Sequence, residues 1–567
     1  MRQHILIFAF CLFVIVGIPR LFSLDAHWSS DEALWLDRSA RFISAIKHGN
    51  FSETLITHHP GVMTMWFAGL RQSFGNAAVS VSLKDLALAR WFIGLVVSGG
   101  LVGIFFILRR MFSFLPALFM WAFLTINPFF LAQSRRVHTD ALATLFILLT
   151  ILLFLLYCIS RWQHRYLICS GIAFGLACLS KSYALILLPW IPMCLVLFRQ
   201  CGHRWRDLFS HAILSIILFL NCSLLTILAL WPIFWTPLFG VLGLCIFGFT
   251  FRLTLQKKWG DQKVLTGAAS AALSIVYFFV LRTSWQVFSG VEWAVTTAHE
   301  IEHFFLGKVV YDPGWLFYLF TLSIKSTPFT VPLVILGFVF LWKRRGETHT
   351  SNQHFRIAIS LLCSILLFIF CLSLTAKKFS RYLLPLFPML DLLAGFGLFY
   401  GVKWIGKRLR VEQFRRVGQI AGIVLIFALT AIPVFALHPY YGTYYNPCWK
   451  ITDITKLITV GEASGLDLAA KYLNQKPNAT RLSVQVSPLG TEFFQYYFKG
   501  SAYPIDKRSD KGFEHPRHVD YEVIYIRDSQ IRRVPQTGTR DGKLEHTIVL
   551  NGIAQVWIYQ IRQETEE

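Results

Sequence analysis

The sequence predicts a polytopic α-helical membrane protein of about thirteen transmembrane helices, with a small α/β domain at its C-terminal end. Of 567 residues, 55% are hydrophobic and only 15% are charged, whereas a soluble globular domain carries about 25% charged residues. Long apolar stretches recur as far as position 437, after which shorter helix and strand patterns follow. This composition also excludes a disordered chain and a disulfide scaffold.

The apolar stretches are each close to the length of about 20 residues that a helix needs to cross a bilayer. The first, at 5–24, follows Arg2 and His4, so we expect a spanning helix rather than a signal peptide. The other expected spans are 86–108, 113–132, 139–158, 166–180, 184–198, 211–232, 234–252, 264–282, 326–342, 357–375, 382–400 and 417–437.

The formal net charge of +23 is distributed as membrane topology requires, which argues against nucleic-acid binding. Short basic runs at 109–110, 161–165, 199–206, 257–258, 343–345 and 403–416 alternate with the loops at 25–65, 133–140, around 181, 284–325 and 376–381. The positive-inside rule places the first set in the cytoplasm. We therefore expect a multi-pass membrane protein with a cytoplasmic N-terminus and a C-terminal domain on the outer face, which the bacterial family resemblance given below would place in the periplasm, on the outer side of the inner membrane.

The expected domains are a transmembrane domain at 1–437, whose first outer loop (25–85) carries an acidic motif, and a soluble domain at 438–567. In the second, the pattern predicts a helix at 460–474 and strands at 481–486 and 521–527. A hairpin is expected from 547–550 and 554–561, because Asn551 and Gly552 between them form the strongest two-residue turn signal.

The first outer loop contains two adjacent carboxylates, Asp31 and Glu32, followed by His58 and His59. One carboxylate at a membrane surface can take a proton from a nucleophile while the other holds a cation or a substrate hydroxyl. Glu32, His58 and His59 are accordingly candidate ligands of a divalent metal cation. The alternative is a solvated acidic turn.

A third carboxylate, Asp140, begins the expected span at 139–158, shortly after Arg135. An acid at the edge of the hydrocarbon costs roughly 2–4 kcal/mol unless it is paired or faces a cavity. It can also be favoured there by the dipole at a helix N-terminus. The two interpretations are compatible.

Cations on the expected outer face point to an anionic ligand. Lys181 lies between two short spans, and Lys377, Lys378 and Arg381 lie in one short outer loop, against the positive-inside trend. Such cations would attract lipid headgroups, a pyrophosphate or a phosphodiester. For Lys181, snorkelling to the headgroups is the alternative.

The segment from His299 to His303 matches the H-E-x-x-H pattern, whose two histidines would share one face of a helix and could bind zinc. No downstream ligand pattern accompanies it, so a metalloprotease is a minor alternative. His299 could also contact a metal or substrate in the same cavity.

Together these fragments resemble the bacterial phospholipid-carrier-dependent glycosyltransferases of the protein O-mannosyltransferase and aminoarabinose-transferase type (GT-C superfamily, glycosyltransferase family 39-like). The resemblance covers nearly the whole membrane region in the expected order. The matching stretches are Ser29-Ser30-Asp31-Glu32-Ala33, His59-Pro60-Gly61-Val62, Asn127-Pro128-Phe129, Ser134-Arg135, Thr139-Asp140, Gly175-Leu176-Ala177 before Lys181, Asp312-Pro313-Gly314-Trp315 with Phe317-Tyr318, and Arg381-Tyr382-Leu383-Leu384-Pro385.

The resemblance implies a polyprenyl-phosphate sugar donor and an acidic residue of the first loop as catalytic base, which maps to Asp31. Lys181 and Arg381 match the positions that meet the donor phosphate. We add Glu32 and Asp140 as catalytic candidates, Lys378 and Arg135 as phosphate-binding candidates, and Tyr382 as a further site residue.

The expected reaction is a single inverting displacement by an acceptor hydroxyl or amine on the outer face of the membrane. An energised phosphodiester donor needs no nucleotide cofactor, and the sequence contains neither a P-loop nor a Rossmann fingerprint. The span count leaves a transporter or flippase of lipid-linked material as the second hypothesis. The identities of the sugar and of the acceptor, whether lipid, glycan or protein, stay open.

Overall fold

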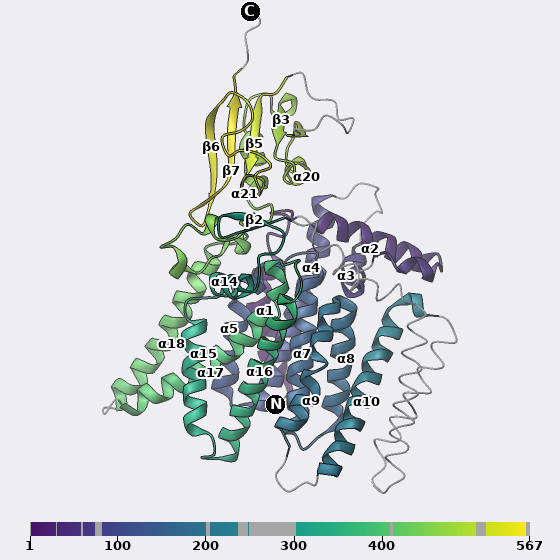
Figure 1. Cartoon of the computed structure of the whole chain (residues 1–567), viewed down its shortest axis with the longest axis vertical. Helices are drawn as coiled ribbons and strands as arrows, with labels where there is room; N and C mark the ends of the chain where they lie inside the picture. Colours follow the sequence, from purple (N-terminus) through teal and green to yellow (C-terminus); the bar gives the residue numbers. More distant parts are fainter. Residues whose placement is uncertain are drawn as a thin grey trace, which may run out of the picture.

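The computed structural model describes residues 2–29, 31–57, 60–73, 82–199, 205–235, 248, 302–408, 412–505 and 518–562. A bundle of long helices forms one part of the molecule, and a β-sheet stands at one end of it (Figure 1). The N-terminus lies near the end of the bundle that is far from the sheet. The predicted fold class, a polytopic helical membrane protein with a small C-terminal α/β domain, is thus confirmed.

The helices of the bundle follow the apolar stretches of the sequence closely. They are α1 (Arg2–Leu21), α4 (Leu83–Met111), α5 (Phe114–Ile126), α6 (Pro128–Gln133), α7 (Thr139–Ile159), α8 (His164–Ser180), α9 (Trp190–Leu197), α10 (Trp205–Leu230), α14 (Leu316–Lys325), α15 (Thr330–Arg344), α16 (His349–Ser373), α17 (Leu386–Arg408) and α18 (Glu412–Phe435).

Six of the described helices are long and apolar enough to cross a membrane. A seventh span is added if α14 and α15, which meet at an angle of 101°, count as one broken span. The expected spans at 234–252 and 264–282 lie almost entirely outside the described residues, so the total of thirteen stays a prediction. The expected pair at 166–180 and 184–198 becomes α8, a 3-10 turn (Ser182–Leu187) and the short α9.

Helix α7 forms the centre of the bundle and packs against α4 and α8. Helix α8 in turn approaches α10 closely, because two small residues face it. A methyl group added at Gly171 or Gly175 would lie 2.6 Å from the carbonyl oxygen of Phe219 or Ser223, respectively. Small residues spaced four apart are typical of helix contacts in membranes, where close backbone approach provides much of the packing.

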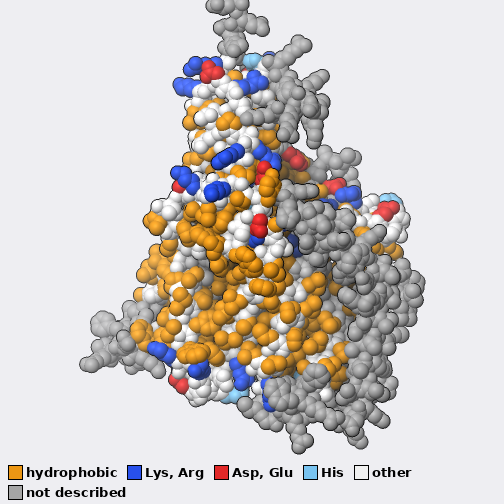
Figure 2. Space-filling view, viewed as in Figure 1, with side chains coloured by type: hydrophobic (Ala, Val, Ile, Leu, Met, Phe, Trp, Pro, Cys, Tyr) orange, Lys and Arg blue, Asp and Glu red, His pale blue; other side chains and the backbone are white. Residues whose placement is uncertain are grey.

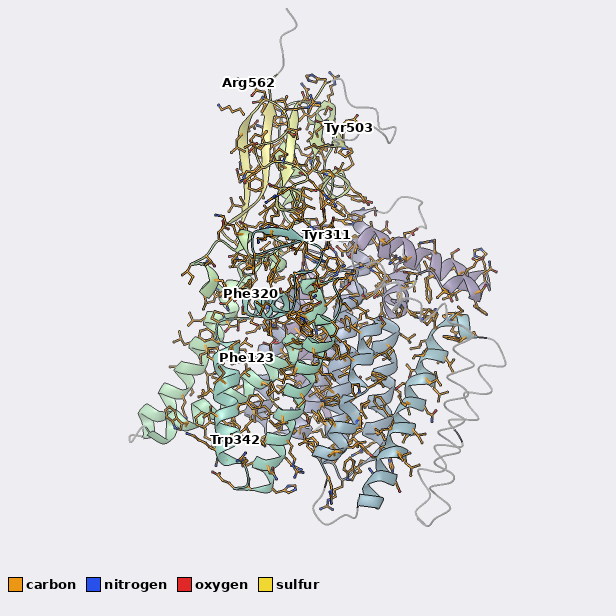
Figure 3. The ribbon with its side chains drawn as sticks, in the orientation of Figure 1. Phe123, Tyr311, Phe320, Trp342, Tyr503 and Arg562 are labelled. Carbon is orange, nitrogen blue, oxygen red and sulfur yellow. The ribbon has the colours of Figure 1, made fainter. Side chains whose placement is uncertain are left out.

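The surface of the bundle matches a membrane-spanning protein. Hydrophobic side chains cover its middle, while Lys and Arg gather near its lower edge and toward the sheet (Figure 2). Exposed aromatic residues mark both ends of this band. Trp342 is 56% exposed toward one end of the bundle and Tyr311 is 55% exposed toward the sheet (Figure 3). Aromatic residues at these levels are typical of the two membrane–water interfaces.

Two helices of the first outer loop, α2 (Glu32–Lys47) and α3 (Val62–Gly69), lie at the end of the bundle next to the sheet (Figure 1). The sequence pattern did not predict α2. Its buried side chains include Trp35, Leu36 and Phe42, so one apolar face holds the helix against the bundle. Asp31 is the N-cap residue of this helix.

The C-terminal sheet has the strand order β4-β3-β5-β7-β6. Its strands are β3 (Ser483–Val486), β4 (Ser501–Pro504), β5 (Tyr521–Tyr525), β6 (Gly542–Leu550) and β7 (Ile553–Ile561). β3 pairs in parallel with β4 and β5, and β7 pairs antiparallel with β5 and β6. In the described part of this domain, three helices accompany the sheet: α19 (Leu466–Leu473), α20 (Thr491–Gln495) and α21 (Ile526–Gln530). Asn551 and Gly552 turn the predicted hairpin with φ values of 51° and 76°.

The sheet domain contacts the first outer loop directly. The ring of Tyr496 stacks on that of Trp28, with centroids 3.7 Å apart, and the Tyr497 hydroxyl donates to the Asp25 carbonyl at 2.8 Å. A second contact comes from the hairpin β1 (His303–Phe305) and β2 (Lys308–Val310), which bridges to Ile458. These contacts place the sheet domain against the end of the bundle where α2 begins.

Candidate functional site

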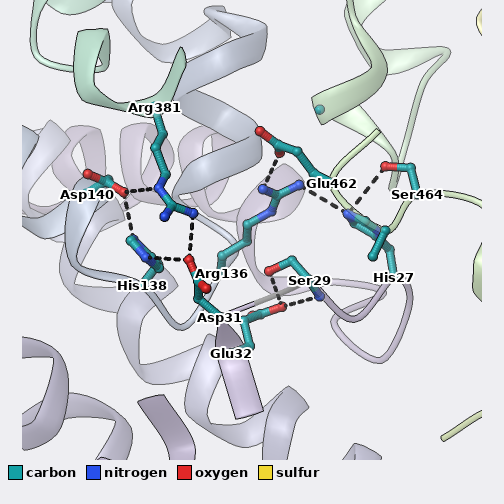
Figure 4. Close-up of polar contacts among 12 residues, drawn as sticks. His27, Ser29, Asp31, Glu32, Arg136, His138, Asp140, Arg381, Glu462 and Ser464 are labelled. Carbon is teal, nitrogen blue, oxygen red and sulfur yellow. Dashed lines mark hydrogen bonds and ion pairs between the residues drawn. The ribbon is translucent and has the colours of Figure 1, made fainter. Parts of the chain in front are cut away.

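Five charged or titratable side chains meet at the end of the bundle that faces the sheet domain, and Figure 4 shows four of them: Asp31, His138, Asp140 and Arg381. The Arg381 guanidinium lies 2.6 Å from the Asp31 carboxylate and 3.8 Å from that of Asp140. The His138 ring lies between the same two carboxylates, 3.3 Å from Asp31 and 2.7 Å from Asp140. Lys181 is ion-paired with the other oxygen of Asp140. The structure therefore brings together Asp31, Asp140, Lys181 and Arg381, which the sequence analysis had proposed as site residues.

Each of these residues lies at a helix terminus. Asp31 is the N-cap residue of α2, and Asp140 lies in the first turn of α7. Lys181 ends α8 with an extended backbone, and Arg381 lies in the 3-10 turn (Ser380–Leu383) that precedes α17. Charged groups can be kept out of the apolar interior at such termini and still meet one another. The site therefore forms where the first residues of α2 and α7, the end of α8 and the turn before α17 meet at one end of the bundle.

The electrostatics of the cluster keep Asp31 ionised. Burial opposes its negative charge, but the charge of Arg381 and a hydrogen bond from His138 outweigh burial and hold the pKa of Asp31 far below its usual value. Burial likewise disfavours the Arg381 cation, yet Asp31 and Asp140 together raise the pKa of Arg381. Since the Asp31 side chain keeps 32% exposure, its carboxylate is both charged and accessible.

Glu32 has a different environment from its neighbour, because its side chain is fully buried. Its two oxygens accept from Nε and Nη2 of Arg90, from the Ser29 amide at 3.0 Å and hydroxyl at 2.8 Å, and from the Val137 amide at 2.8 Å. Burial opposes ionisation, but Arg90 lowers the pKa of Glu32 to about 2. These five donors occupy the carboxylate that the sequence analysis offered as a catalytic group or metal ligand.

A cavity of about 300 Å³ opens beside this cluster. Asp31, His138 and Arg381 line it from the membrane side. Its opposite wall comes from the chain beyond the last bundle helix, including Glu462 and Arg527. The sheet domain, to which the sequence analysis assigned no chemistry, therefore contributes side chains to this cavity.

Two other predicted residues, Lys378 and Arg135, have partners that limit their roles. Lys378, 1% exposed, binds Asp312 at 2.6 Å and the Thr375 carbonyl at 2.7 Å. Arg135 donates to the carbonyls of Pro19, Phe22 and Ser23, at the end of α1. Lys378 lines the cavity, whereas Arg135 is not among its lining residues.

The Tyr382 ring lies 4.4 Å from the Lys181 ammonium, which places it beside the cluster. The predicted His58, His59 and His299 lie outside the described residues. His303, the second histidine of the H-E-x-x-H match, belongs to strand β1 rather than to a helix. Among the described residues, no group of three or more His, Cys, Asp or Glu side chains is arranged to hold a metal ion.

Sequence analysis did not select His138 of the cluster. It also missed Arg136, Lys325 and Glu462, which line the cavity, and His27, which contacts Arg136. Arg136 is ion-paired with Glu462, and its other terminal nitrogen lies 3.1 Å from Nε2 of His27. Burial and the charge of Arg136 lower the pKa of His27 to about 3, so this ring is neutral and accepts from Arg136. The Lys325 ammonium donates to the Gly442 carbonyl at 3.0 Å and lies 3.8 Å from the ring of Tyr445.

Comparison with known proteins relates part of the chain to a family. Residues 59–227 match the family described as dolichyl-phosphate-mannose-protein mannosyltransferase. The matched region includes Asp140 and Lys181, and over these residues it confirms the family resemblance that the sequence motifs indicated. No curated protein matches the sequence significantly.

Several solved structures share similarity with the chain at low identity. An oligosaccharyltransferase from Archaeoglobus fulgidus, in complex with an inhibitory peptide and a dolichol-phosphate, is 12% identical with a TM-score of 0.47. That match covers 92% of this chain and 70% of the other. The ArnT protein from Cupriavidus metallidurans, bound to undecaprenyl phosphate, is 12% identical with a TM-score of 0.42, and 98% of each chain is covered.

Proposed function

We propose that the chain is an integral membrane glycosyltransferase that moves a sugar from a polyprenyl-phosphate donor to an acceptor hydroxyl or amine. One observation carries the proposal: an ionised, accessible carboxylate, Asp31, shares a guanidinium with Asp140 beside a cavity at the end of an apolar bundle. A lipid-linked substrate cannot leave the bilayer, so its enzyme must present reactive groups at the level of the headgroups. The family match over residues 59–227 supports the same class of donor.

In the proposed reaction, Asp31 takes the proton of the acceptor while the acceptor oxygen or nitrogen attacks the anomeric carbon of the sugar. The bond from that carbon to the phosphate oxygen breaks, and the electron pair leaves with the polyprenyl phosphate. The configuration at the anomeric carbon inverts in this single displacement. Arg381 and Lys181 would stabilise the negative charge that grows on the leaving phosphate.

The ion pairs within the cluster support this division of roles. Arg381 is bound to Asp31 at 2.6 Å, so a donor phosphate that binds Arg381 competes with Asp31 for the same cation. Loss of that pairing would make the carboxylate a stronger base, because a nearby positive charge stabilises the ionised form. Donor binding would in this way prepare Asp31 to accept a proton.

The proposed sidedness places this site in the periplasm and the N-terminus in the cytoplasm of a bacterial inner membrane. Basic residues support it, because Arg109 and Arg110 lie in the last turn of α4 and Lys343 lies in the last turn of α15. The positive-inside rule places such helix ends in the cytoplasm. Figure 2 shows blue side chains at the lower edge of the bundle, opposite the sheet. Protease accessibility of the sheet domain in sealed spheroplasts would test this orientation.

Replacement of Asp31 tests the proposed base. The protein would be reconstituted in liposomes with a panel of polyprenyl-phosphate sugars, and release of polyprenyl phosphate would be measured together with sugar transfer. We expect Asp31→Asn to abolish transfer on the donor that the wild-type protein consumes. Asp37→Asn is the matched control, because Asp37 lies on the same helix with its side chain 56% exposed, paired with Arg41. Near-normal transfer by Asp31→Asn would refute the assignment.

A divalent cation at His58 and His59 is also a proposal, tested by titration of the reconstituted protein with a chelator. The geometry gives no support for Glu32 as a ligand of this cation, because donors from Arg90, Ser29 and Val137 already occupy its oxygens. Activity that is lost with chelator and restored by a defined cation would support the metal site. Unchanged activity at saturating chelator would contradict it.

A further inference from the structure

The wall of the cavity opposite Asp31 includes residues 458–462. We call residues 458–463 the roof segment. It is held from two sides. The hairpin that begins with β1 bridges to Ile458. From the sheet domain, the Gln530 side chain accepts from the Val460 amide at 2.8 Å and donates to the Ile458 carbonyl at 3.1 Å. The position of the roof segment is therefore set by the sheet domain as well as by the membrane part.

Three consecutive residues of the roof segment have positive φ values: Gly461 (109°), Glu462 (108°) and Ala463 (66°). For residues with a side chain this conformation costs roughly 1–3 kcal/mol each, and it persists only where the surroundings enforce it. Here the enforcing group is the hydroxyl of Tyr525 in β5, which accepts from the amides of Glu462 at 2.6 Å and Ala463 at 2.7 Å. A Cβ atom at position 461 would overlap that hydroxyl, so this approach requires glycine.

The strained turn directs the Glu462 side chain into the cavity, where it is ion-paired with Arg136 (Figure 4). Burial disfavours the Glu462 charge, but Arg136 outweighs it and lowers the pKa of the carboxyl. Arg136 belongs to the loop between α6 and α7. In that loop the Val137 amide binds Glu32 at 2.8 Å, and the His138 ring lies 3.3 Å from Asp31. One ion pair thus links the sheet domain to the loop that contacts both first-loop carboxylates.

The charge of Glu462 also balances that of Arg136 within the cavity. Arg136, Arg381 and Asp31 line the same cavity. Without Glu462, Arg136 would be a buried cation without its carboxylate partner, close to the one carboxylate that must accept a proton. Leaving one member of a buried pair uncompensated is strongly unfavourable, so the loop would be expected to rearrange toward another anion.

We propose that Glu462 is a positioning residue of the transferase, through which the C-terminal sheet domain fixes Arg136 and the adjacent His138 relative to Asp31. The sheet domain is then an integral part of the catalytic unit rather than an appended module. The inference rests on the proposed function, because transfer is its readout. Its own test concerns the turnover number and is separate from the identity of the base.

The experiment compares Glu462→Gln, which keeps size and removes charge, with Tyr525→Phe, which removes only the hydroxyl that holds the strained turn. Both are expected to lower kcat by about 10- to 100-fold, as small misplacements of reacting groups do. The donor KM should stay within about twofold, because neither residue contacts the phosphate-binding cations. Glu462→Asp, which keeps the charge, should recover part of the loss.

Tyr472→Phe is the matched control, since Tyr472 donates to Glu545 at 2.6 Å elsewhere in the same domain. It should leave kcat unchanged. The double variant Glu462→Gln/Tyr525→Phe should be no slower than the more impaired single variant, because both act through one turn.

Two results would overturn the proposal. The first is wild-type kcat in both Glu462→Gln and Tyr525→Phe. The second is a fall in kcat in the Tyr472→Phe control as large as that in Glu462→Gln, since the effect would then not be specific to the roof segment. An active Asp31→Asn variant would instead refute the base assignment, while the dependence of turnover on Glu462 would still be measurable.

Discussion

Replacing Glu32 with glutamine is expected to destabilise the protein, whereas the adjacent Asp31→Asn should mainly abolish transfer. Glu32 is fully buried and binds the Arg90 guanidinium at both oxygens. Glutamine keeps the size of the side chain but removes its charge, so Arg90 is left in the interior with the carbonyls of Leu24, Ala26 and His27 as its acceptors. Removing one partner of a buried ion pair typically costs about 3–5 kcal/mol.

The pKa of Glu32 gives a second measure of the same cost. It is lowered from 4.5 to about 2, which corresponds to about 3 kcal/mol of differential stabilisation of the ionised form. Because the folded pKa is the lower one, this stability is fully present above pH 4.5 and is lost as the pH falls toward 2. The Glu32→Gln variant should therefore lose the corresponding part of the acid sensitivity of unfolding.

Thermal unfolding of the detergent-solubilised protein, followed at neutral pH and at several acidic pH values, would measure both effects. We expect a lower apparent Tm for Glu32→Gln at pH 7 and a smaller difference from wild type near pH 3. Asp31→Asn is the comparison, because its side chain is 32% exposed and a solvated group contributes less. If Glu32→Gln unfolds at the wild-type temperature at pH 7, the structural role derived for Glu32 is wrong.

Two further predictions concern the cations. Arg381→Ala should raise the donor KM by about tenfold or more, because charge-assisted phosphate contacts are strong; a donor titration measures this, and an unchanged KM excludes phosphate contact. Lys181→Gln should affect donor use more than Lys378→Gln, since Lys181 joins the cluster at Asp140 whereas Lys378 is paired with Asp312. Equal effects of these two variants would contradict the assignment.

Much of the bundle could be predicted because a helix that crosses lipid must be apolar along its whole length. The expected span at 139–158 corresponds to α7 (Thr139–Ile159), and that at 86–108 lies within α4 (Leu83–Met111). The expected span at 184–198 is shortened, because a 3-10 turn follows Lys181 and α9 begins only after Pro189. Helix α2 was missed, since a helix that lies in an outer loop with one apolar face lacks a continuous hydrophobic run.

The cluster of Asp31, Asp140, Lys181 and Arg381 could be anticipated because each residue lies in a loop that the charge pattern assigns to one side of the membrane. The role of Glu32 could not. Consecutive residues at the start of a helix point in directions about 100° apart, so one carboxylate reaches the cavity while its neighbour is buried against Arg90. Glu462 had no signal, because its partner Arg136 is 326 positions away in the sequence.

The stacking of Tyr496 on Trp28 joins segments that are synthesised far apart in time. Of the described bundle helices only α1 precedes the loop that carries Asp31, whereas the ring that stacks on Trp28 of this loop comes after all of them. During translation this loop lacks its contacts with the sheet domain while the remaining helices insert. A chain that ended before the sheet domain would therefore carry Asp31, Asp140, Lys181 and Arg381 and still lack the surface that completes the first loop.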